Sequence, residues 1–161
     1  MVKKISKLDV TLGGLINCVS KSVATWKPVE AKREIQYSAA LAEYLREACP
    51  EDIRVETEYR HGGTTADVWL SWTGHFLKDE VFFELKRNLE KKTDYDRLVG
   101  QIEALKPRDH NVIVVLVGGT SKELLGRLKE HYEDLLGTQS LLVPGRDNGE
   151  LRIVTVNAAP P

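Results

Sequence analysis

The segment from residue 111 to 117 most constrains the fold of this chain. It reads Asn-Val-Ile-Val-Val-Leu-Val, so aliphatic side chains follow one another with no polar alternation. A strand that is apolar on both sides has to be covered on both sides. Helix-like patterns flank this segment, over residues 93–106 before Pro107 and over residues 121–136 after it. The sequence therefore predicts a central strand in a sheet that is covered by helices.

The remaining segments extend this sheet. A helical pattern over residues 30–48 ends before Pro50, and it is followed by strand-like segments separated by glycine-containing turns, over residues 53–60, 66–72 and 80–88. The C-terminal part predicts a short strand, a turn and a last strand, over residues 140–143, 144–149 and 150–156. Strands that first meander and then cross over predict an α/β fold, a three-layer sandwich with a central mixed β-sheet flanked by helices.

The N-terminal part predicts a helix in front of this body. Between residues 8 and 26, apolar residues recur at steps of three and four, although Gly13 and Gly14 weaken the helix. We expect it to pack on the body or on a second subunit. A chain of 161 residues fits one domain, with an N-terminal helical extension (1–28), core motifs (29–118) and a C-terminal helix and strand pair (119–161).

Composition excludes several classes of protein. With 42% hydrophobic and 29% charged residues, the chain is neither disordered nor fibrous. The net charge of -1 gives no long-range attraction to a polyanion, although residues 1–33 sum to +5 and the rest to -6. The 2 cysteines have no zinc-binding spacing, and no apolar stretch is long enough for a membrane span. We expect a cytoplasmic protein.

One strand-like segment carries two opposite charges on a single face. Along residues 80–88, Glu84 and Lys86 share a face with Phe82, because side chains alternate along a strand. In the preceding strand, Asp67 lies on the face opposite to the apolar set that begins at Ala66. If these strands pair antiparallel about a midpoint between residues 75 and 76, Asp67 falls opposite Glu84. The pattern predicts two carboxylates and an ammonium group in one site.

This arrangement suits phosphate chemistry. Two carboxylates on adjacent strands can bind Mg²⁺, which keeps water and substrate oxygens as its other ligands. Lys86 could orient or deprotonate an attacking water and neutralise charge on the phosphate. The alternative is a solvated sheet face with ordinary cross-strand ion pairs. The tripeptide Glu-x-Lys is not specific, since it also occurs at residues 30–32 and 90–92.

A third carboxylate falls on the apolar side of a predicted helix. At about 100° per residue, Glu34 groups with Ser38, Leu41, Ala42 and Leu45. Its position has an ordinary explanation, because acidic residues are favoured in the first turn of a helix. The functional interpretation is that Glu34 points at the same site, as a metal ligand or as an acceptor for one.

The order helix-Glu, strand-Asp, strand-Glu-x-Lys, helix-Gln, strand resembles the PD-(D/E)xK nuclease superfamily, with its restriction-endonuclease-like fold. The resemblance covers roughly residues 30–118, and Gln101 matches the glutamine on the following helix. The proline that the motif has before the aspartate is Ala66 here. The resemblance implies a metal-dependent DNA nuclease that hydrolyses phosphodiester bonds with Mg²⁺ or Mn²⁺, more often as an endonuclease than an exonuclease. It implies metal ligands and catalytic residues as follows: Asp67, Glu84, Glu34 and the Leu85 carbonyl for the metal, and Asp67, Glu84, Lys86, Glu34 and Gln101 for catalysis.

Basic residues near these motifs are candidates for contacts with DNA phosphates. They are Arg87, Lys91 and Lys92 after the Glu-x-Lys strand, and Lys32 and Arg33 before Glu34. Solvated surface charge explains the same residues. The rival to a nuclease is an inactive domain of this fold that serves as a nucleic-acid-binding or assembly module. Gly118-Gly119 also allows a small-nucleotide site at the next helix. So small a nuclease would work as a homodimer or as one subunit of a larger complex.

Overall fold

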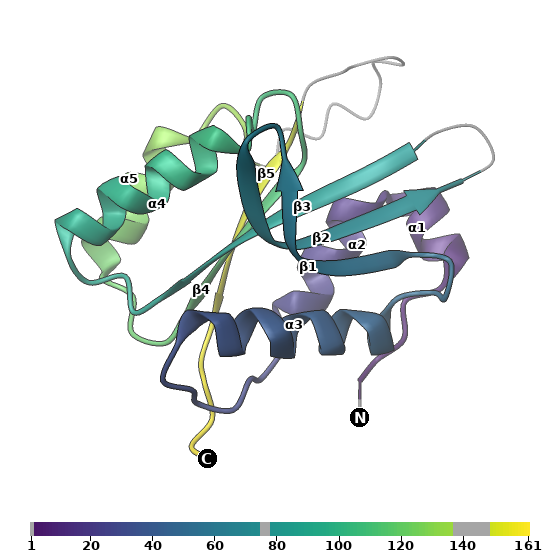
Figure 1. Ribbon diagram of the computed structural model, residues 1–161, viewed down its shortest axis with the longest axis horizontal. Helices are drawn as coiled ribbons and strands as arrows, with labels where there is room; N and C mark the ends of the chain where they lie inside the picture. Colours follow the sequence, from purple (N-terminus) through teal and green to yellow (C-terminus); the bar gives the residue numbers. More distant parts are fainter. Residues whose placement is uncertain (1, 75–77, 137–148) are drawn as a thin grey trace.

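The computed structural model describes residues 2–74, 78–136 and 149–161. Within these ranges a five-stranded mixed sheet runs in the order β1-β2-β3-β4-β5 (Figure 1). The first three strands pair antiparallel, whereas β3, β4 and β5 are parallel. The strands are β1 (Arg54–His61), β2 (Thr64–Thr73), β3 (Lys78–Arg87), β4 (Val112–Val117) and β5 (Leu151–Val156). The predicted α/β fold is confirmed.

Helices cover both faces of the sheet, which gives the three layers (Figure 1). One core lies under the N-terminal helices, α1 (Lys7–Gly13), α2 (Leu15–Val23) and α3 (Glu34–Ala48). The other core lies under α4 (Lys92–Ala104) and α5 (Lys122–His131). Strand β4 belongs to both cores, because its residues alternate between them and all six are buried. In the described ranges, no helix has the length and apolar character that crossing a bilayer requires.

The register of β2 and β3 agrees with the one predicted. Val68 pairs with Phe83, and Trp69 pairs with Phe82. One further step along this register brings Asp67 level with Glu84. One detail of the prediction is wrong: Ala66 packs with Trp69 and Phe82, on the face opposite to Val68. Strand β2 departs from regular alternation between Ala66 and Val68. Opposite this point in β1 lies Glu58, which has φ +48° and is skipped in the pairing of the two strands.

The N-terminal extension forms two helices where the sequence predicted one. Gly14 has φ +83°, a left-handed conformation that favours glycine and ends α1. The second helix begins at once, and its Leu15 amide donates to the Asp79 carboxylate on β3 at 3.3 Å. Leu15, Val19 and Val23 are completely buried. The extension therefore packs on the body, which was one of the two arrangements expected.

Two predicted helices are shorter in the structure. Helix α3 begins at Glu34, not at residue 30, because the preceding segment is extended and pairs with the C-terminal segment through Val29 and Ala159. Gln36 fixes the entry to α3 by accepting from the backbone amides of Lys32 and Arg33. Helix α5 ends at His131, five residues earlier than predicted. The strand predicted over residues 140–143, and the turn up to residue 148, lie outside the described residues.

Candidate active site at the end of strand β3

The last buried residues of β3 are charged. Six consecutive residues of this strand are buried, from Val81 to Lys86. Glu84 is 2% exposed and Lys86 is 7% exposed. On the neighbouring strand β4, the residues level with them are Val114 and Leu116. Burying a charged group costs several kcal/mol unless other groups compensate. The groups around Glu84 and Lys86 therefore decide how their charges are tolerated.

Two carboxyl groups lie on adjacent strands, Glu84 buried and Asp67 half-buried. Burial raises the pKa of Glu84 to about 9, and the negative charges of Asp67 and Glu34 add to the shift. Burial also raises the pKa of Asp67 to about 6, although Asp67 accepts a hydrogen bond of 2.7 Å from the Leu85 amide. The two groups resist being ionised together. A cation placed between them would remove that resistance.

Lys86 connects this pair to two helices. Its Nζ lies 3.6 Å from Glu34 Oε2 and 3.6 Å from Asp94 Oδ1. Both partners stand in the first turn of their helices, α3 and α4, where a carboxylate is favoured by the helix dipole. Lys86 also lowers the pKa of Asp67 and of Glu84 by its positive charge. At the end of β3, a carboxylate from each helical layer therefore contacts the same lysine.

Glu34 lies at the end of β3 beside Lys86, on the side of the helix that its periodicity predicted. Its Oε2 accepts a hydrogen bond from the Arg87 amide at 2.8 Å, in addition to its contact with Lys86. Its side chain is 45% exposed, so it belongs to the rim of the site and not to the core. Four of the five predicted catalytic residues, Glu34, Asp67, Glu84 and Lys86, thus come together.

Gln101 is not brought to this group. It lies two helical turns beyond Asp94 on α4, about 10 Å further along the helix axis, and its side chain is exposed. Within the part of the chain that the structure describes, we find no hydrogen bond from the Gln101 side chain.

The predicted DNA-binding residues separate into two groups. Lys91, Lys92, Lys32 and Arg33 have exposed side chains, as phosphate contacts require. Lys92 also approaches Asp96 one turn along its helix. Arg87 forms the second group, because it also has a structural role. Its Nη1 donates to the backbone carbonyls of Ala31 and Lys32. It fastens the segment before α3 to the end of β3.

Two acidic residues of this site escaped prediction. Asp94 faces Lys86, and Glu58, on β1, raises the pKa of Asp67 by its charge. A signal for Asp94 existed, because an acidic residue in the first turn of the helix after β3 comes back to the end of that strand. Glu58 carried no such signal, since its placement depends on the irregular pairing of β1 with β2.

The donor set fits a hard divalent cation. Mg²⁺ needs one or two carboxylates, with water and substrate oxygens as its other ligands. Asp67 and Glu84 supply two, and their raised pKa values show that the protein does not neutralise them fully. Among the described residues, no three His, Cys, Asp or Glu side chains form a group that could hold a metal ion.

Comparisons with known proteins assign this chain to no family. No family model matches the chain, and no curated protein matches it. Among solved structures, it is similar to the structure of Pyrococcus furiosus SfsA in complex with Ca²⁺, with a TM-score of 0.42 and 14% identity. The match covers 76% of this chain and 58% of that chain. At this level, the similarity carries no inference about the site.

Proposed function

We propose that this protein is a metal-dependent DNA nuclease of the PD-(D/E)xK kind, which hydrolyses phosphodiester bonds and acts as an endonuclease. The observation that carries the proposal is the buried Glu84 and the half-buried Asp67, both with a raised pKa, beside the buried Lys86. Perturbed carboxyl groups that converge on one point of a fold are typical of functional sites. The motif order supports the same function.

Asp67, Glu84 and the Leu85 carbonyl would hold Mg²⁺ or Mn²⁺, with Glu34 at the rim. A bound divalent cation supplies a Lewis acid for the phosphate and an activated water. The Asp67 carboxylate is held in place by the Leu85 amide at 2.7 Å, so it needs no rearrangement to act as a ligand. Glu34 shares one oxygen between the Arg87 amide and Lys86, which fixes its direction.

Lys86 would act on the substrate itself. Its ammonium group has three donors, and its two carboxylate partners hold it at the end of β3. There it orients the attacking water and balances the negative charge that develops on the phosphoryl oxygens. The exposed lysines 32, 91 and 92, with Arg33, would contact phosphates on either side of the cleaved bond. The working form would be a homodimer or a subunit of a larger complex.

The test is a cleavage assay on supercoiled, linear and branched DNA with Mg²⁺ or Mn²⁺. We expect the wild type to cut at least one of these substrates and Lys86→Ala to lose the activity. Lys129→Ala, which removes an exposed lysine from α5, is the matched control and retains full activity. Equal cleavage by the wild type and Lys86→Ala, or no cleavage of any substrate by the wild type, contradicts the proposal.

One observation favours a second candidate, an inactive domain of this fold that binds nucleic acid or assembles with a partner. Lys86 already has two carboxylate partners, and Asp67 already has the Leu85 amide. These groups hold one another without a ligand. Binding to DNA by the wild type without cleavage in Mg²⁺ or Mn²⁺, and with no effect of either ion on stability, would favour this candidate over the nuclease.

A further inference from the structure

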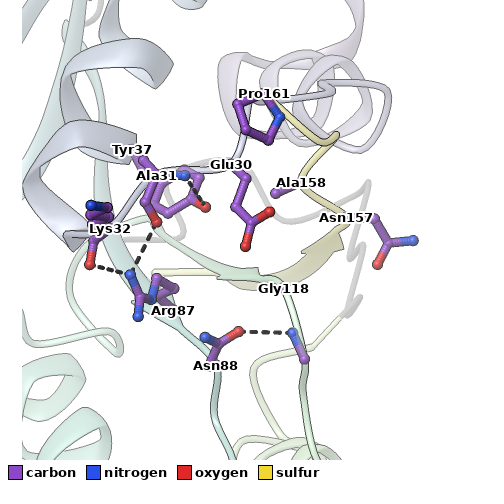
Figure 2. A pocket seen from close by; sticks show the side chains of 11 residues that line it. Glu30, Ala31, Lys32, Tyr37, Arg87, Asn88, Gly118, Asn157, Ala158 and Pro161 are labelled. Carbon is purple, nitrogen blue, oxygen red and sulfur yellow. Dashed lines mark hydrogen bonds between the residues drawn. The ribbon is translucent and has the colours of Figure 1, made fainter.

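A cavity of about 610 Å³ opens beside the candidate active site (Figure 2). It lies past the carboxyl ends of the three parallel strands, next to Arg87 at the end of β3 and Gly118 after β4. Ligands of open α/β sheets bind at this end of the strands. The volume is in the range of small-molecule sites. The residues that line the cavity include neither the proposed metal ligands nor Lys86 and its two carboxylate partners.

Arg87 presents a fixed positive charge to the cavity. Its Nη1 is held by the carbonyls of Ala31 and Lys32, while an arginine has five N–H donors in all. In the described residues, the other three have no protein acceptor. Because the guanidinium group is already oriented, an anionic ligand would bind to it with little loss of side-chain entropy. Lys32 also lines the cavity and brings a second positive charge.

The wall beside Arg87 is sterically constrained. Asn88 has φ +50°, and its Oδ1 accepts from the Gly119 amide at 3.0 Å. In the part of the chain that the structure describes, no acceptor takes the two N–H groups of its carboxamide, so they can donate to a ligand. A Cβ at Gly118 would lie 2.4 Å from Asn88 Oδ1, so glycine is required there. Figure 2 shows the Glu30 side chain directed toward this wall, which places a carboxylate acceptor across from the amide donors.

A mononucleotide has the chemistry that these groups recognise. Its phosphate suits Arg87 and Lys32. The edge of its base suits an amide donor and a carboxylate acceptor, which are the groups that read base edges elsewhere. A base inside a duplex cannot enter a pocket of this kind without leaving its stack. An unpaired nucleotide has no such barrier.

We propose that this cavity binds one unpaired nucleotide of the DNA strand that is cut, directly beside the scissile phosphate. The proposal rests on the proposed nuclease function and gives it a substrate class, DNA with a single-stranded or frayed segment at the cleavage position. The link to the active site is Glu34, whose Oε2 contacts both the Arg87 amide at 2.8 Å and Lys86 Nζ at 3.6 Å. A nucleotide held by Arg87 places its neighbouring phosphate near Lys86.

The first experiment measures the binding of deoxynucleoside 5′-monophosphates to the full chain in EDTA, by titration calorimetry and by amide chemical shifts. We expect the shifts to centre on Arg87, Asn88 and Gly118. Lys32→Ala and Glu30→Gln should each weaken binding about tenfold, the effect of one charge-assisted hydrogen bond. Lys129→Ala, on α5, is the control and should bind as the wild type does. Shifts centred elsewhere, or inorganic phosphate binding as tightly as the nucleotides, overturn the proposal.

The second experiment separates the pocket from the nuclease. Lys86→Ala should bind mononucleotides as the wild type does but cut no DNA. Lys32→Ala and Glu30→Gln should raise KM about tenfold on DNA with an unpaired segment, with little change in kcat. An unchanged KM in both variants overturns the nucleotide pocket and leaves the nuclease standing. A wild type that binds nucleotides in the cavity but cuts nothing overturns the nuclease and supports the pocket.

Discussion

The two halves of the buried part of β3 differ in chemistry but not in burial. Residues 81–83 read Val-Phe-Phe, and residues 84–86 read Glu-Leu-Lys, while all six side chains are buried. Strand β4 runs parallel beside them and places Val114 and Leu116 level with Glu84 and Lys86. The sheet therefore accepts aliphatic residues in these rows. Burying a charged group costs free energy that an aliphatic residue in the same row does not, and this cost is the physical reason to propose a function for Glu84 and Lys86.

The largest effect should follow from making β3 resemble β4. Lys86→Leu places at the end of β3 the residue that β4 has in the same row. We expect DNA cleavage to fall by about 10² to 10⁴, the usual contribution of a positioned catalytic group, since an uncharged side chain cannot orient water or balance phosphoryl charge. Cleavage rates under single-turnover conditions measure this. Retention of more than a tenth of the wild-type rate would argue against a role for Lys86 in the chemistry.

A substitution in the apolar half of β3 should lower the free energy of unfolding, with no direct effect on the candidate site. Phe83→Ala leaves a cavity in the core under α2 and α3, where Phe83 is completely buried. We expect the free energy of unfolding to fall by about 3 to 4 kcal/mol. Urea denaturation followed by circular dichroism measures it. A loss below about 1 kcal/mol would mean that this half of β3 is not the part that holds the layers together.

The charged half should gain stability when the titratable carboxyl group of Glu84 is removed. Because burial raises the pKa of Glu84 to about 9, the folded state holds a proton that the unfolded state releases above about pH 4.5. Stability is therefore lost as the pH rises from that point toward 9. Glu84→Gln removes this loss, and we expect it to raise the free energy of unfolding at pH 8 on the order of 2 kcal/mol. Denaturation at pH 5 and at pH 8 gives the comparison.

The gain in Glu84→Gln should be larger at pH 8 than at pH 5. Leu45→Ala in α3 is the control, because Leu45 is completely buried about three helical turns beyond Glu34 and its effect on stability should not depend on pH. If Glu84→Gln lowered the free energy of unfolding at pH 8, the buried Glu84 carboxyl group would not be destabilising, and the prediction would be wrong.

The smallest effect is stabilisation by Mg²⁺. Deprotonated carboxylates bind metal, so the affinity should rise with pH through the pKa of Asp67, about 6, and toward that of Glu84, about 9. At a concentration ten times the dissociation constant, we expect a gain of about 1.4 kcal/mol in the free energy of unfolding. Thermal unfolding with MgCl₂ or with NaCl of equal ionic strength measures it. A gain of equal size in Glu84→Gln would place the ion elsewhere.

Much of the fold was predictable because its signals are local. The aliphatic run of β4 predicted a central strand, and the spacing of residues about the β2–β3 turn predicted the register that brings Asp67 level with Glu84. Gly13 and Gly14 were recognised as a weak point, but whether they bend or divide the helix depends on φ at Gly14, which the Asp79 contact with α2 helps to fix. Local pattern could not decide that.

The candidate site was predictable only in part, for the same reason. Glu84 and Lys86 share a face by strand alternation alone, and Glu34 followed from helix periodicity. Arg87 was expected at a phosphate, but its guanidinium holds two carbonyls of a segment more than fifty positions away in the chain. Contacts of that range leave no periodic trace in a sequence.

The sequence by itself determined which residues are charged within an apolar strand, and the alternation of that strand determined which of them share a face. Only the tertiary structure decided that the first turns of α3 and α4 deliver Glu34 and Asp94 to Lys86, and that a cavity opens beyond Arg87. The physical reason is that periodicity reports the direction of a side chain from its own element. Distances between elements depend on how the layers pack, and the packing is set by the whole core.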